Sequence, residues 1–268
     1  MPKGVTEILQ ITDTHLFADR GGRLKGVDVD AGLRSVLAEA SRRHPHAEAV
    51  LLTGDLVQEE TAPSYQRLAG YMAGLGMPTY CLPGNHEDKA LLARACEDGA
   101  LRCESRVFIG GWQILLLDSA QPPAPGGWLA REELERAERS LAEHPDVPAL
   151  MALHHPPLSV NSPWMDTMQV ANGGQLLALV DRHPQVAAVV FGHIHQAFET
   201  VRNGVRFLGS PSTCVQFLPG AAASAVDHRP PGYRWLELAP DGGLDTGVGR
   251  APWAECEETG STQGPATG

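Results

Sequence analysis

Five short polar blocks, each placed just after an apolar run, constrain the fold of this chain more than any other feature. The runs with their blocks are Ile8–Ile11 before Asp13-Thr14-His15, Val50–Leu52 before Gly54-Asp55, Thr79–Leu82 before Gly84-Asn85-His86, Leu150–Leu153 before His154-His155-Pro156, and Val189–Phe191 before Gly192-His193-Ile194-His195. Apolar runs of this length are typical of buried strands. Because open α/β sheets bind ligands at the carboxyl ends of their strands, we expect the blocks to meet at one site.

The side chains in these blocks are the ones that divalent metal ions bind. Carboxylate, amide and imidazole groups without a thiolate favour iron, manganese, zinc or cobalt over a closed zinc–sulfur site. Two adjacent ions also need a carboxylate that can bridge them, and they lower the pKa of a bound water toward ~7. The blocks together predict a two-metal hydrolase that acts on an anionic phosphodiester. Any one block alone is a weak signal, since a lone histidine after a strand is often a core residue.

In this order, the five blocks resemble the calcineurin-like metallophosphoesterase superfamily. Further stretches resemble one subgroup, the bacterial class III 3′,5′-cyclic AMP phosphodiesterases. These stretches are Leu9–Leu16, Phe191–Gln196, Ser210–Phe217, and Pro231–Arg234 followed by Leu236–Leu238. The resemblance covers residues 7–250. It implies an α/β fold, a four-layer α/β/β/α sandwich with two mixed sheets and a dinuclear metal site at the strand C-terminal ends.

The family motif also implies a role for each matching residue. It places Asp13, His15 and His195 on one metal, Asn85, His154 and His193 on the other, and Asp55 between the two as the bridge. The family pattern His-x-Pro selects His154 over His155. His155 is then expected behind the ligands or on the rim of the site.

Contacts to the substrate are expected from residues at and beside the ligands. In the family, the histidine that matches His86 contacts the phosphate or protonates the leaving oxygen; a core histidine bonded to the backbone is the alternative. Trp164 lies in Asn161–Asn172 and is expected either to stack on a base or to pack in the interior. The remaining substrate contacts implied are His15, Asp55, Asn85 and His195.

Charge and composition exclude some classes of partner. The formal net charge is −11, and the lysines are Lys3, Lys25 and Lys89 alone. Such a chain repels a phosphate backbone, so no nucleic-acid polymer is expected as a partner. No secretory signal and no apolar run of ~20 residues occurs, so a cytoplasmic protein without membrane contact is expected. The odd count and irregular spacing of the cysteines (Cys81, Cys96, Cys103, Cys214 and Cys256) predict reduced thiols rather than a disulfide framework.

One domain is expected over residues 1–250, with a disordered tail over residues 251–268 that is rich in Gly, Ser, Thr and Pro. Apolar residues at helical spacing predict helices over Val29–Arg43, Ala62–Leu75, Asp88–Glu97, Arg131–Glu143 and Gly174–Arg182. Turn residues predict hairpins within Val107–Asp118, within Thr200–Phe207, and between Tyr233–Leu238 and Leu244–Val248. Of two loops rich in turn residues, Gln121–Gly127 is expected on the surface and Leu218–Pro231 on the rim of the site.

The expected activity is hydrolysis of 3′,5′-cyclic AMP to 5′-AMP by attack of a metal-bridging hydroxide. Another small-molecule phosphodiesterase, such as a glycerophosphodiesterase, is the alternative, because the same metal residues would serve both. A phosphoprotein phosphatase is disfavoured, because Gln58 and Pro83 stand in stretches that lack the arginines of that branch. A non-enzymatic scaffold with a decayed site is disfavoured, because competent residues fill all the ligand positions. The oligomeric state is left open, a homodimer included.

Overall fold

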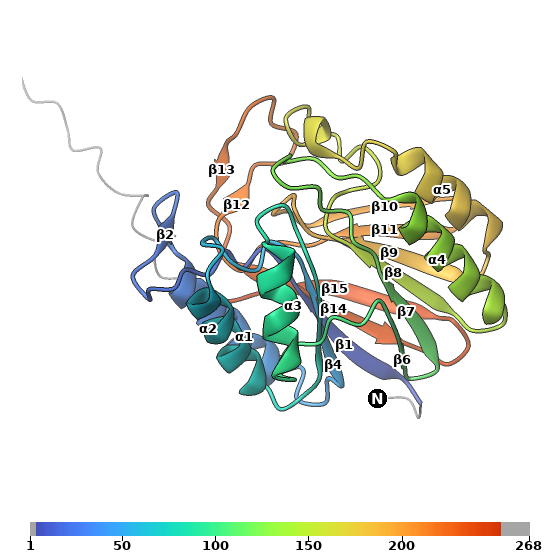
Figure 1. Ribbon diagram of the computed structural model, residues 1–268, viewed down its shortest axis with the longest axis horizontal. Coiled ribbons are helices and arrows are strands. Elements are labelled where there is room, and N and C mark those ends of the chain that lie inside the picture. Colours follow the sequence, from blue (N-terminus) through green and yellow to red (C-terminus); the bar gives the residue numbers. More distant parts are fainter. Residues whose placement is uncertain (1–3, 253–268) are drawn as a thin grey trace, which may run out of the picture.

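The computed structural model describes residues 4–252, and within them two β-sheets lie face to face between two layers of helices. Figure 1 shows α1, α2 and α3 on the outer face of one sheet and α4 and α5 on the outer face of the other. The helices are α1 (Val29–Arg43), α2 (Ala62–Ala73), α3 (Lys89–Glu97), α4 (Arg131–Glu143) and α5 (Gly173–Arg182). The four-layer α/β/β/α sandwich implied by the resemblance is therefore confirmed.

The first sheet has the strand order β15-β14-β1-β4-β5. Its strands are β1 (Thr6–Ile11), β4 (Ala49–Thr53), β5 (Thr79–Leu82), β14 (Gly232–Leu238) and β15 (Leu244–Arg250). β1, β4 and β5 run parallel, whereas β14 is antiparallel to both β1 and β15. The parallel strands therefore end at the same edge of this mixed sheet.

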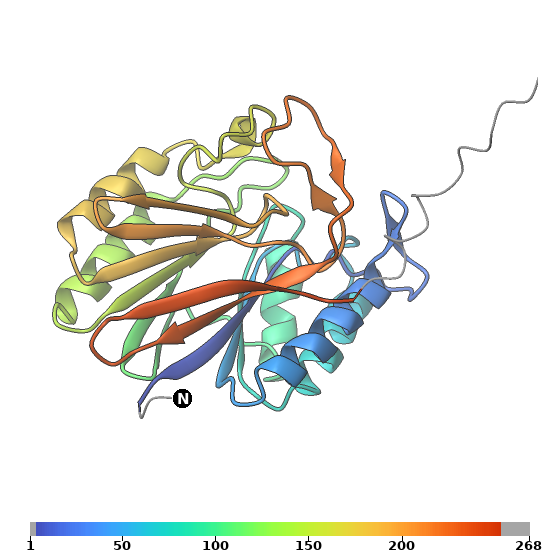
Figure 2. The ribbon, with the colours of Figure 1, turned by 180° about the vertical axis from the view of Figure 1, so that it is seen from behind.

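The second sheet has the order β10-β11-β9-β8-β7-β6. Its strands are β6 (Arg106–Ile109), β7 (Trp112–Leu116), β8 (Ala149–Leu153), β9 (Val186–Phe191), β10 (Phe198–Arg202) and β11 (Val205–Gly209). The four strands β7, β8, β9 and β11 are parallel, and the outer strands are antiparallel hairpin partners. Figure 2 shows the hairpins β10–β11 and β14–β15 on the same side of the sandwich.

Alternation along the strands divides the core into layers. In β1, Ile8 belongs to the cluster between the sheets, which also contains Leu150 of β8, while Leu9 belongs to the cluster under α1. In β8, Met151 points the other way and packs with residues of α4 and α5. Successive side chains of a strand face opposite sides of a sheet, so strands covered on both faces are apolar throughout. This is why the runs show no polar alternation.

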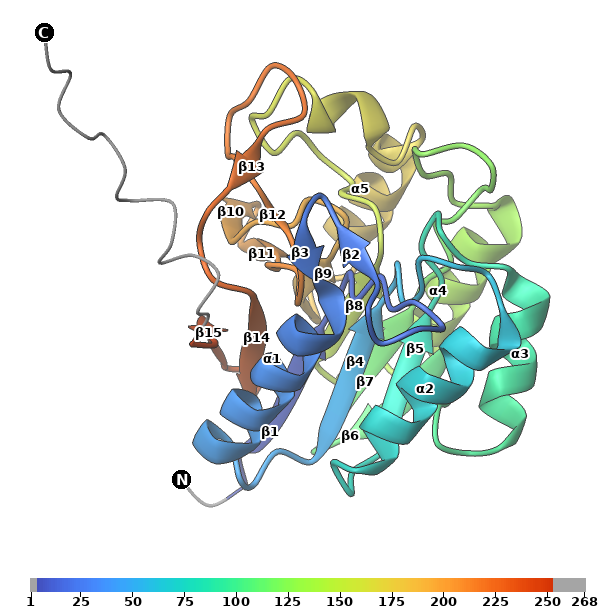
Figure 3. The ribbon, with the colours of Figure 1, turned by 90° about the vertical axis from the view of Figure 1, so that its left-hand side faces the viewer.

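Small elements complete the molecule at the end where the parallel strands finish. They are the ribbon β2 (Arg23–Leu24) with β3 (Val27–Asp28), the ribbon β12 (Gln216–Phe217) with β13 (Val226–Asp227), and the 3-10 helix η1 (Met165–Met168). Figure 3 shows both ribbons toward this end of the sandwich. The sequence did not predict them, because strands of two residues have no period to detect. The loop Leu218–Pro231, predicted as irregular, contains β13.

The predicted helices agree with the structure to within two residues at each end. Asp28 and Asp88 cap α1 and α3 by accepting hydrogen bonds from backbone N–H groups in the first turn. Among the described residues, no helix has the length and apolarity needed to cross a bilayer. Most of the predicted tail, residues 253–268, lies outside the described part, and Ala251 is buried.

The prediction of reduced cysteines throughout is wrong for one pair, because Cys96 and Cys103 form a disulfide. The chain after α3 returns beside β5, where Arg102 pairs with Tyr80, and this return brings the two cysteines together. Spacing along the sequence did not reveal a contact that depends on this tertiary return. Cys81 and Cys214 are free and buried, as expected.

Candidate metal centre

The polar blocks converge where β1, β4 and β5 of the first sheet and β8 and β9 of the second sheet end. The residues delivered are Asp13 and His15 after β1, Asp55 after β4, Asn85 and His86 after β5, His154 after β8, and His193 and His195 after β9. The parallel strands of both sheets point their carboxyl ends at this place. The structure thus brings together every ligand candidate that the sequence singles out.

One group of candidate ligands is formed by Asp13, His15 and His195, whose ligand atoms lie within 4.8 Å of one another. His195 Nε2 lies 3.3 Å from Asp13 Oδ1 and 3.3 Å from His15 Nε2. All three side chains are buried. A cation could be shared by this carboxylate and these two imidazoles.

A second group forms around His154 and His193, and Asp55 lies between the two groups. His193 Nδ1 is 3.1 Å from His154 Nε2. Asp55 faces both groups: its Oδ1 is 3.3 Å from His154 Nε2, and its Oδ2 is 3.7 Å from His15 Nε2. One carboxylate with an oxygen toward each group is the arrangement that a bridging ligand requires.

Buried polar atoms without partners support the presence of a cation here. Among the described residues, Asn85 Oδ1 and His193 Nε2 are buried and have no hydrogen-bond partner. Such atoms are rare in proteins, and an ion is one of their ordinary explanations. The donor set therefore fits a divalent metal ion held by oxygen and nitrogen.

The pKa shifts within the cluster also favour a bound cation. Burial raises the pKa of Asp55, but His154 and His15 outweigh burial and hold it well below its usual range. Burial lowers the pKa of His154, but Asp55 and Asp13 outweigh burial and raise it to about 9. Burial lowers the pKa of His15 to about 4. Two buried carboxylates thus draw positive charge into the site, and a metal ion would supply it.

The backbone at these residues adopts conformations that the sequence does not show. Asp13, His15, Asp55, His193 and His195 all have positive φ values, between 44° and 68°. Non-glycine residues rarely adopt this region, and such residues cluster at functional sites. The strain is tolerated because neighbouring hydrogen bonds fix the turns.

Close packing explains two of the motif glycines. A Cβ atom at Gly84 would lie 2.2 Å from Asp55 Oδ1, and a Cβ atom at Gly192 would lie 2.1 Å from Thr12 Oγ1. Real Cβ atoms do not approach other atoms so closely. Both glycines are therefore needed for the blocks to meet.

Glu87 ties two of the blocks together, a role that the sequence did not reveal. Its buried carboxylate accepts hydrogen bonds from the backbone N–H groups of Asp55, Leu56 and Gly84. Asp55 Oδ1 in turn accepts from the backbone N–H of His86 at 3.1 Å. Glu87 directly follows Gly84-Asn85-His86 in the sequence. Its hydrogen bonds to the turn that contains Asp55 could not be inferred from the sequence.

The candidate histidines are oriented by their second ring nitrogens. His154 Nδ1 donates to Thr53 O at 2.8 Å, and His195 Nδ1 donates to Val215 O at 2.8 Å. Gln58 Oε1 lies 3.0 Å from His15 Nδ1. Partners of this kind fix which nitrogen faces a metal. Gln58 therefore orients His15, a role that the sequence did not reveal.

His86 and His155 occupy different positions. His86 is only partly buried, lines the pocket, and stands edge-on to His15 with ring centroids 5.0 Å apart. His155 is fully buried, with Nδ1 2.9 Å from Ser119 Oγ and a ring nitrogen within 4.8 Å of those of His154 and His193, so it lies against the cluster and not on the rim. The core role considered for His86 is not what the structure shows.

A pocket of about 200 Å³ opens onto the cluster. Its outer wall contains Trp164, which directly precedes η1, Phe217 of β12, and Lys25 of the β2–β3 turn. Phe217 stacks on His195 with ring centroids 4.4 Å apart, and Trp164 stands edge-on to Phe217 at 4.9 Å. Trp164 also packs on the core of the second sheet, so both roles considered for it are compatible. Phe217 and Lys25 were not singled out from the sequence, where neither has a chemical motif of its own.

The calcineurin-like phosphoesterase family matches residues 6–197 of the chain. The chain is 38% identical over 243 residues to the 3′,5′-cyclic adenosine monophosphate phosphodiesterase CpdA of Pseudomonas aeruginosa, covering 91% of this chain and 89% of that protein. It is 42% identical over 245 residues to the protein of the same name from Escherichia coli (strain K12), with coverage of 91% and 89%.

Solved structures agree with the fold. A dimetal phosphatase from Danio rerio superimposes with a TM-score of 0.62 at 13% identity, covering 87% of this chain and 95% of that one. The purple acid phosphatase PPD1 from yellow lupin gives a TM-score of 0.60 at 13% identity, covering 92% and 51%. At this level of identity the likeness concerns the fold alone.

Proposed function

The chain belongs to the calcineurin-like phosphoesterase family, and from this premise we propose that it hydrolyses 3′,5′-cyclic AMP to 5′-AMP. One observation of the structure carries the proposal. Candidate metal ligands from both sheets line the floor of a small pocket whose outer wall is aromatic and apolar. Such a pocket suits a small diester with a flat base, because the phosphate meets the charged floor and the base meets the aromatic wall.

We propose two divalent ions per chain, iron, manganese, zinc or cobalt, held by the groups described above. Asp13, His15 and His195 would hold one, Asn85, His154 and His193 the other, and Asp55 would contact both. The position of the Asp55 oxygens between the two groups supports this assignment. When bound, such ions acidify water and stabilise charge that develops on phosphoryl oxygens.

The residues of the chain then have distinct tasks in the reaction. The P–O bond to the 3′ oxygen breaks while water supplies the new oxygen on phosphorus, and the departing 3′ oxygen takes up a proton. His86 lies on the pocket wall beside His15 and is the side chain placed to contact the phosphoryl group or to deliver that proton. Trp164 and Phe217 would exclude water and hold the base.

The charge around the pocket favours a small substrate over a polymer. Within residues 4–252, Lys25 is the only lysine or arginine that lines it, and the chain carries a net charge of −11. A nucleic acid would need a track of cations along a groove. A cyclic nucleotide needs only the metal ions and a short wall.

A panel of substrates tests the proposal. Purified protein would be freed of metal, reloaded with Mn²⁺, Fe²⁺ or Co²⁺ in separate samples, and assayed on 3′,5′-cyclic AMP, 3′,5′-cyclic GMP, 2′,3′-cyclic AMP, a glycerophosphodiester and single-stranded DNA. We expect 5′-AMP from 3′,5′-cyclic AMP, no cleavage of DNA and no turnover without metal. Rapid cleavage of the glycerophosphodiester without hydrolysis of cyclic AMP would rule out cyclic AMP as the substrate. Metal-dependent hydrolysis of a phosphodiester would remain the reaction.

A further inference from the structure

Three cysteines converge beside β5, away from the candidate metal centre. Cys81 lies in β5, Cys96 in α3 and Cys103 in the segment that returns along β5. The Sγ atom of Cys81 is 3.6 Å from the Sγ atoms of both Cys96 and Cys103, which are joined to each other as a disulfide. The proposed function uses none of the three.

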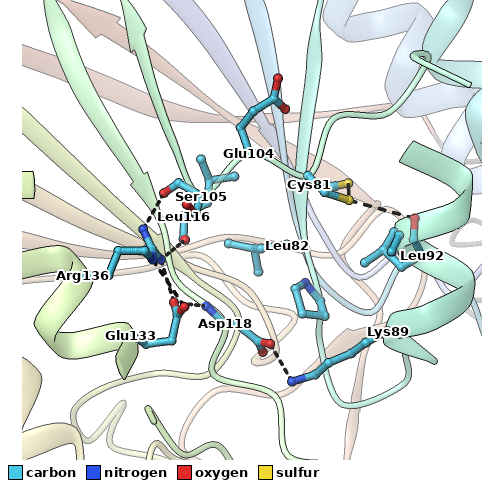
Figure 4. Close-up of a pocket in the computed structure, with 13 residues that line it drawn as sticks. Cys81, Leu82, Lys89, Leu92, Glu104, Ser105, Leu116, Asp118, Glu133 and Arg136 are labelled. Atoms are coloured by element: carbon cyan, nitrogen blue, oxygen red, sulfur yellow. Dashed lines mark hydrogen bonds and ion pairs between the residues drawn. The ribbon is translucent and has the colours of Figure 1, made fainter. Parts of the chain in front are cut away.

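Two of the three cysteines, Cys81 and Cys103, line a second pocket, shown in Figure 4. The pocket has a volume of about 260 Å³, and Cys81, Cys103, Leu92 and Glu104 are among the residues that line it. It shares no lining residue with the pocket of the candidate metal centre. Small solutes can therefore reach the cysteines without passing through the site of hydrolysis.

Apart from Glu104, the charged groups that line this second pocket already have partners. Lys89 Nζ donates to Asp118 at 2.6 Å, and Arg136 donates to Glu133 at 2.6 Å. Dashed lines in Figure 4 mark both pairs. A site for a free anion is thus disfavoured, and the thiol groups are the reactive chemistry left at this pocket.

We propose that reduction of the Cys96–Cys103 disulfide creates a binding site for one thiophilic metal ion, of the class of Zn²⁺, with Cys81, Cys96 and Cys103 as its ligands. Zinc–thiolate bonds of ~2.3 Å in a tetrahedron separate neighbouring sulfur atoms by about 3.8 Å. Two of the three separations are already 3.6 Å. Only Cys96 and Cys103 need to move apart, and because Cys81 and Cys103 line the pocket, a water molecule could complete the tetrahedron.

The backbone keeps two of the three ligands in place whether or not the disulfide is formed. Cys81 N donates to Arg102 O at 2.8 Å, and Arg102 N donates to Thr79 O at 2.9 Å. These bonds fix Cys103 relative to β5. Cys96 lies in the last turns of α3, so breaking the disulfide leaves it within reach of the other two.

Reduction proceeds by ordinary thiol exchange with two molecules of a small thiol. The first, as its thiolate, attacks the exposed sulfur of Cys103, forming a mixed disulfide and releasing the Cys96 thiolate, which takes up a proton. The second releases the small thiol as its own disulfide and leaves Cys103 as a thiol. Metal binding then displaces the protons of the three thiols.

The two sites can be distinguished by experiment because their ligand atoms differ. The candidate metal centre offers only oxygen and nitrogen, whereas the cysteine site offers sulfur, which prefers zinc, cadmium or copper(I). Cd²⁺ bound to thiolates gives an ultraviolet charge-transfer band that oxygen and nitrogen ligands do not give. The band therefore reports the cysteine site even when the other site also binds the ion.

The experiment titrates Cd²⁺ into manganese-loaded full-length protein, in disulfide and fully reduced forms. All samples carry Cys256→Ser, because Cys256 lies outside the described residues. We expect a band that saturates at one Cd²⁺ per chain in the reduced protein and no band in the disulfide form. Cys214→Ser is the matched control, since Cys214 is also free and buried, and it should leave the band unchanged.

Two variants test the ligands. Even the loss of a residue that only hydrogen-bonds to a metal ligand weakens metal binding about 10–100-fold. Cys81 is proposed as a direct ligand, so Cys81→Ser should weaken Cd²⁺ binding by at least ~10-fold. Cys96→Ser should do the same, and because Cys96 is less buried it guards against a folding defect in the first variant. Absence of the band in reduced protein, or an unchanged band in both variants, would overturn the site. Neither result bears on hydrolysis of cyclic AMP, which is measured separately.

Discussion

The floor and the wall of the active-site pocket are built in different ways. The floor, defined as Asp13, His15, Asp55, Asn85, His154, His193 and His195, is nearly all buried and is delivered by long parallel strands of both sheets. The wall, defined as Leu24, Lys25, Trp164, Met165, Met168 and Phe217, comes from two-residue ribbons and a single 3-10 turn. Under the proposed function, the floor would determine the chemistry and the wall would determine which diester is accepted.

The largest effect is expected from removing the carboxylate that faces both ligand groups. Asp55→Ala should lower turnover by at least about 10³-fold, because neither group keeps its shared ligand. Asp181→Ala is the matched control, since Asp181 lies on the surface and pairs with Arg202. Turnover is measured together with the melting temperature. If Asp55→Ala retains more than a few per cent of the rate at saturating metal, the floor does not depend on a bridge.

His86 lies where the floor meets the wall, so His86→Ala separates binding of metal from chemistry. We expect kcat to fall about 10²–10⁴-fold, the usual contribution of a positioned acid or charge-stabilising group, with metal content unchanged. His46→Ala, an exposed histidine, is the control. If His86→Ala loses as much bound metal as Asn85→Ala does, His86 is a metal ligand and belongs to the floor.

Glu87 holds the floor together from behind, so its loss should act on metal affinity and not on the wall. Glu87→Ala removes the acceptor for four backbone N–H groups, those of Asp55, Leu56, Val57 and Gly84. Affinity for Mn²⁺ should fall about 10–100-fold, with much of the rate restored at saturating metal. Glu60→Ala, which removes an exposed carboxylate from the loop between β4 and α2, serves for comparison. Equal affinity for Mn²⁺ in Glu87→Ala and Glu60→Ala would show that Glu87 does not hold the ligand turns in place.

The smallest effect is expected at the wall. Stacking on an aromatic ring contributes about 1–3 kcal/mol per base, so Trp164→Ala should raise KM for cyclic AMP about fivefold or more and leave kcat nearly unchanged. KM for a glycerophosphodiester, which lacks a base, should not change. Trp128→Ala is the control, because Trp128 is exposed and does not line the pocket. An equal increase in KM for both substrates would show that Trp164 does not recognise the base.

The contrast between floor and wall also separates what the sequence predicts from what it does not. The floor was predictable because apolar runs such as Thr79–Leu82 end in residues of metal-binding type, and a parallel sheet brings such ends together. The wall was only partly predictable. Trp164 and the stretch Ser210–Phe217 were identified, but the β2–β3 ribbon that carries Lys25 has no pattern of its own.

Other features depend on contacts between distant residues. The pairing of Gln58 with His15, the four backbone hydrogen bonds to Glu87 and the Cys96–Cys103 disulfide each follow from the tertiary arrangement. Positive φ at Asp13 and Asp55 is imposed by the meeting of the turns, not by these residue types. No spacing along the chain encodes such features.

Diffraction from crystals grown with Mn²⁺, collected at an X-ray energy where manganese scatters anomalously, tests the account of the floor most directly. The account predicts two anomalous peaks per chain, ~3.5–4 Å apart as in other two-metal sites, with one oxygen of Asp55 toward each. A single peak held by four protein ligands, with Asp55 bound to it alone or not at all, would contradict the account.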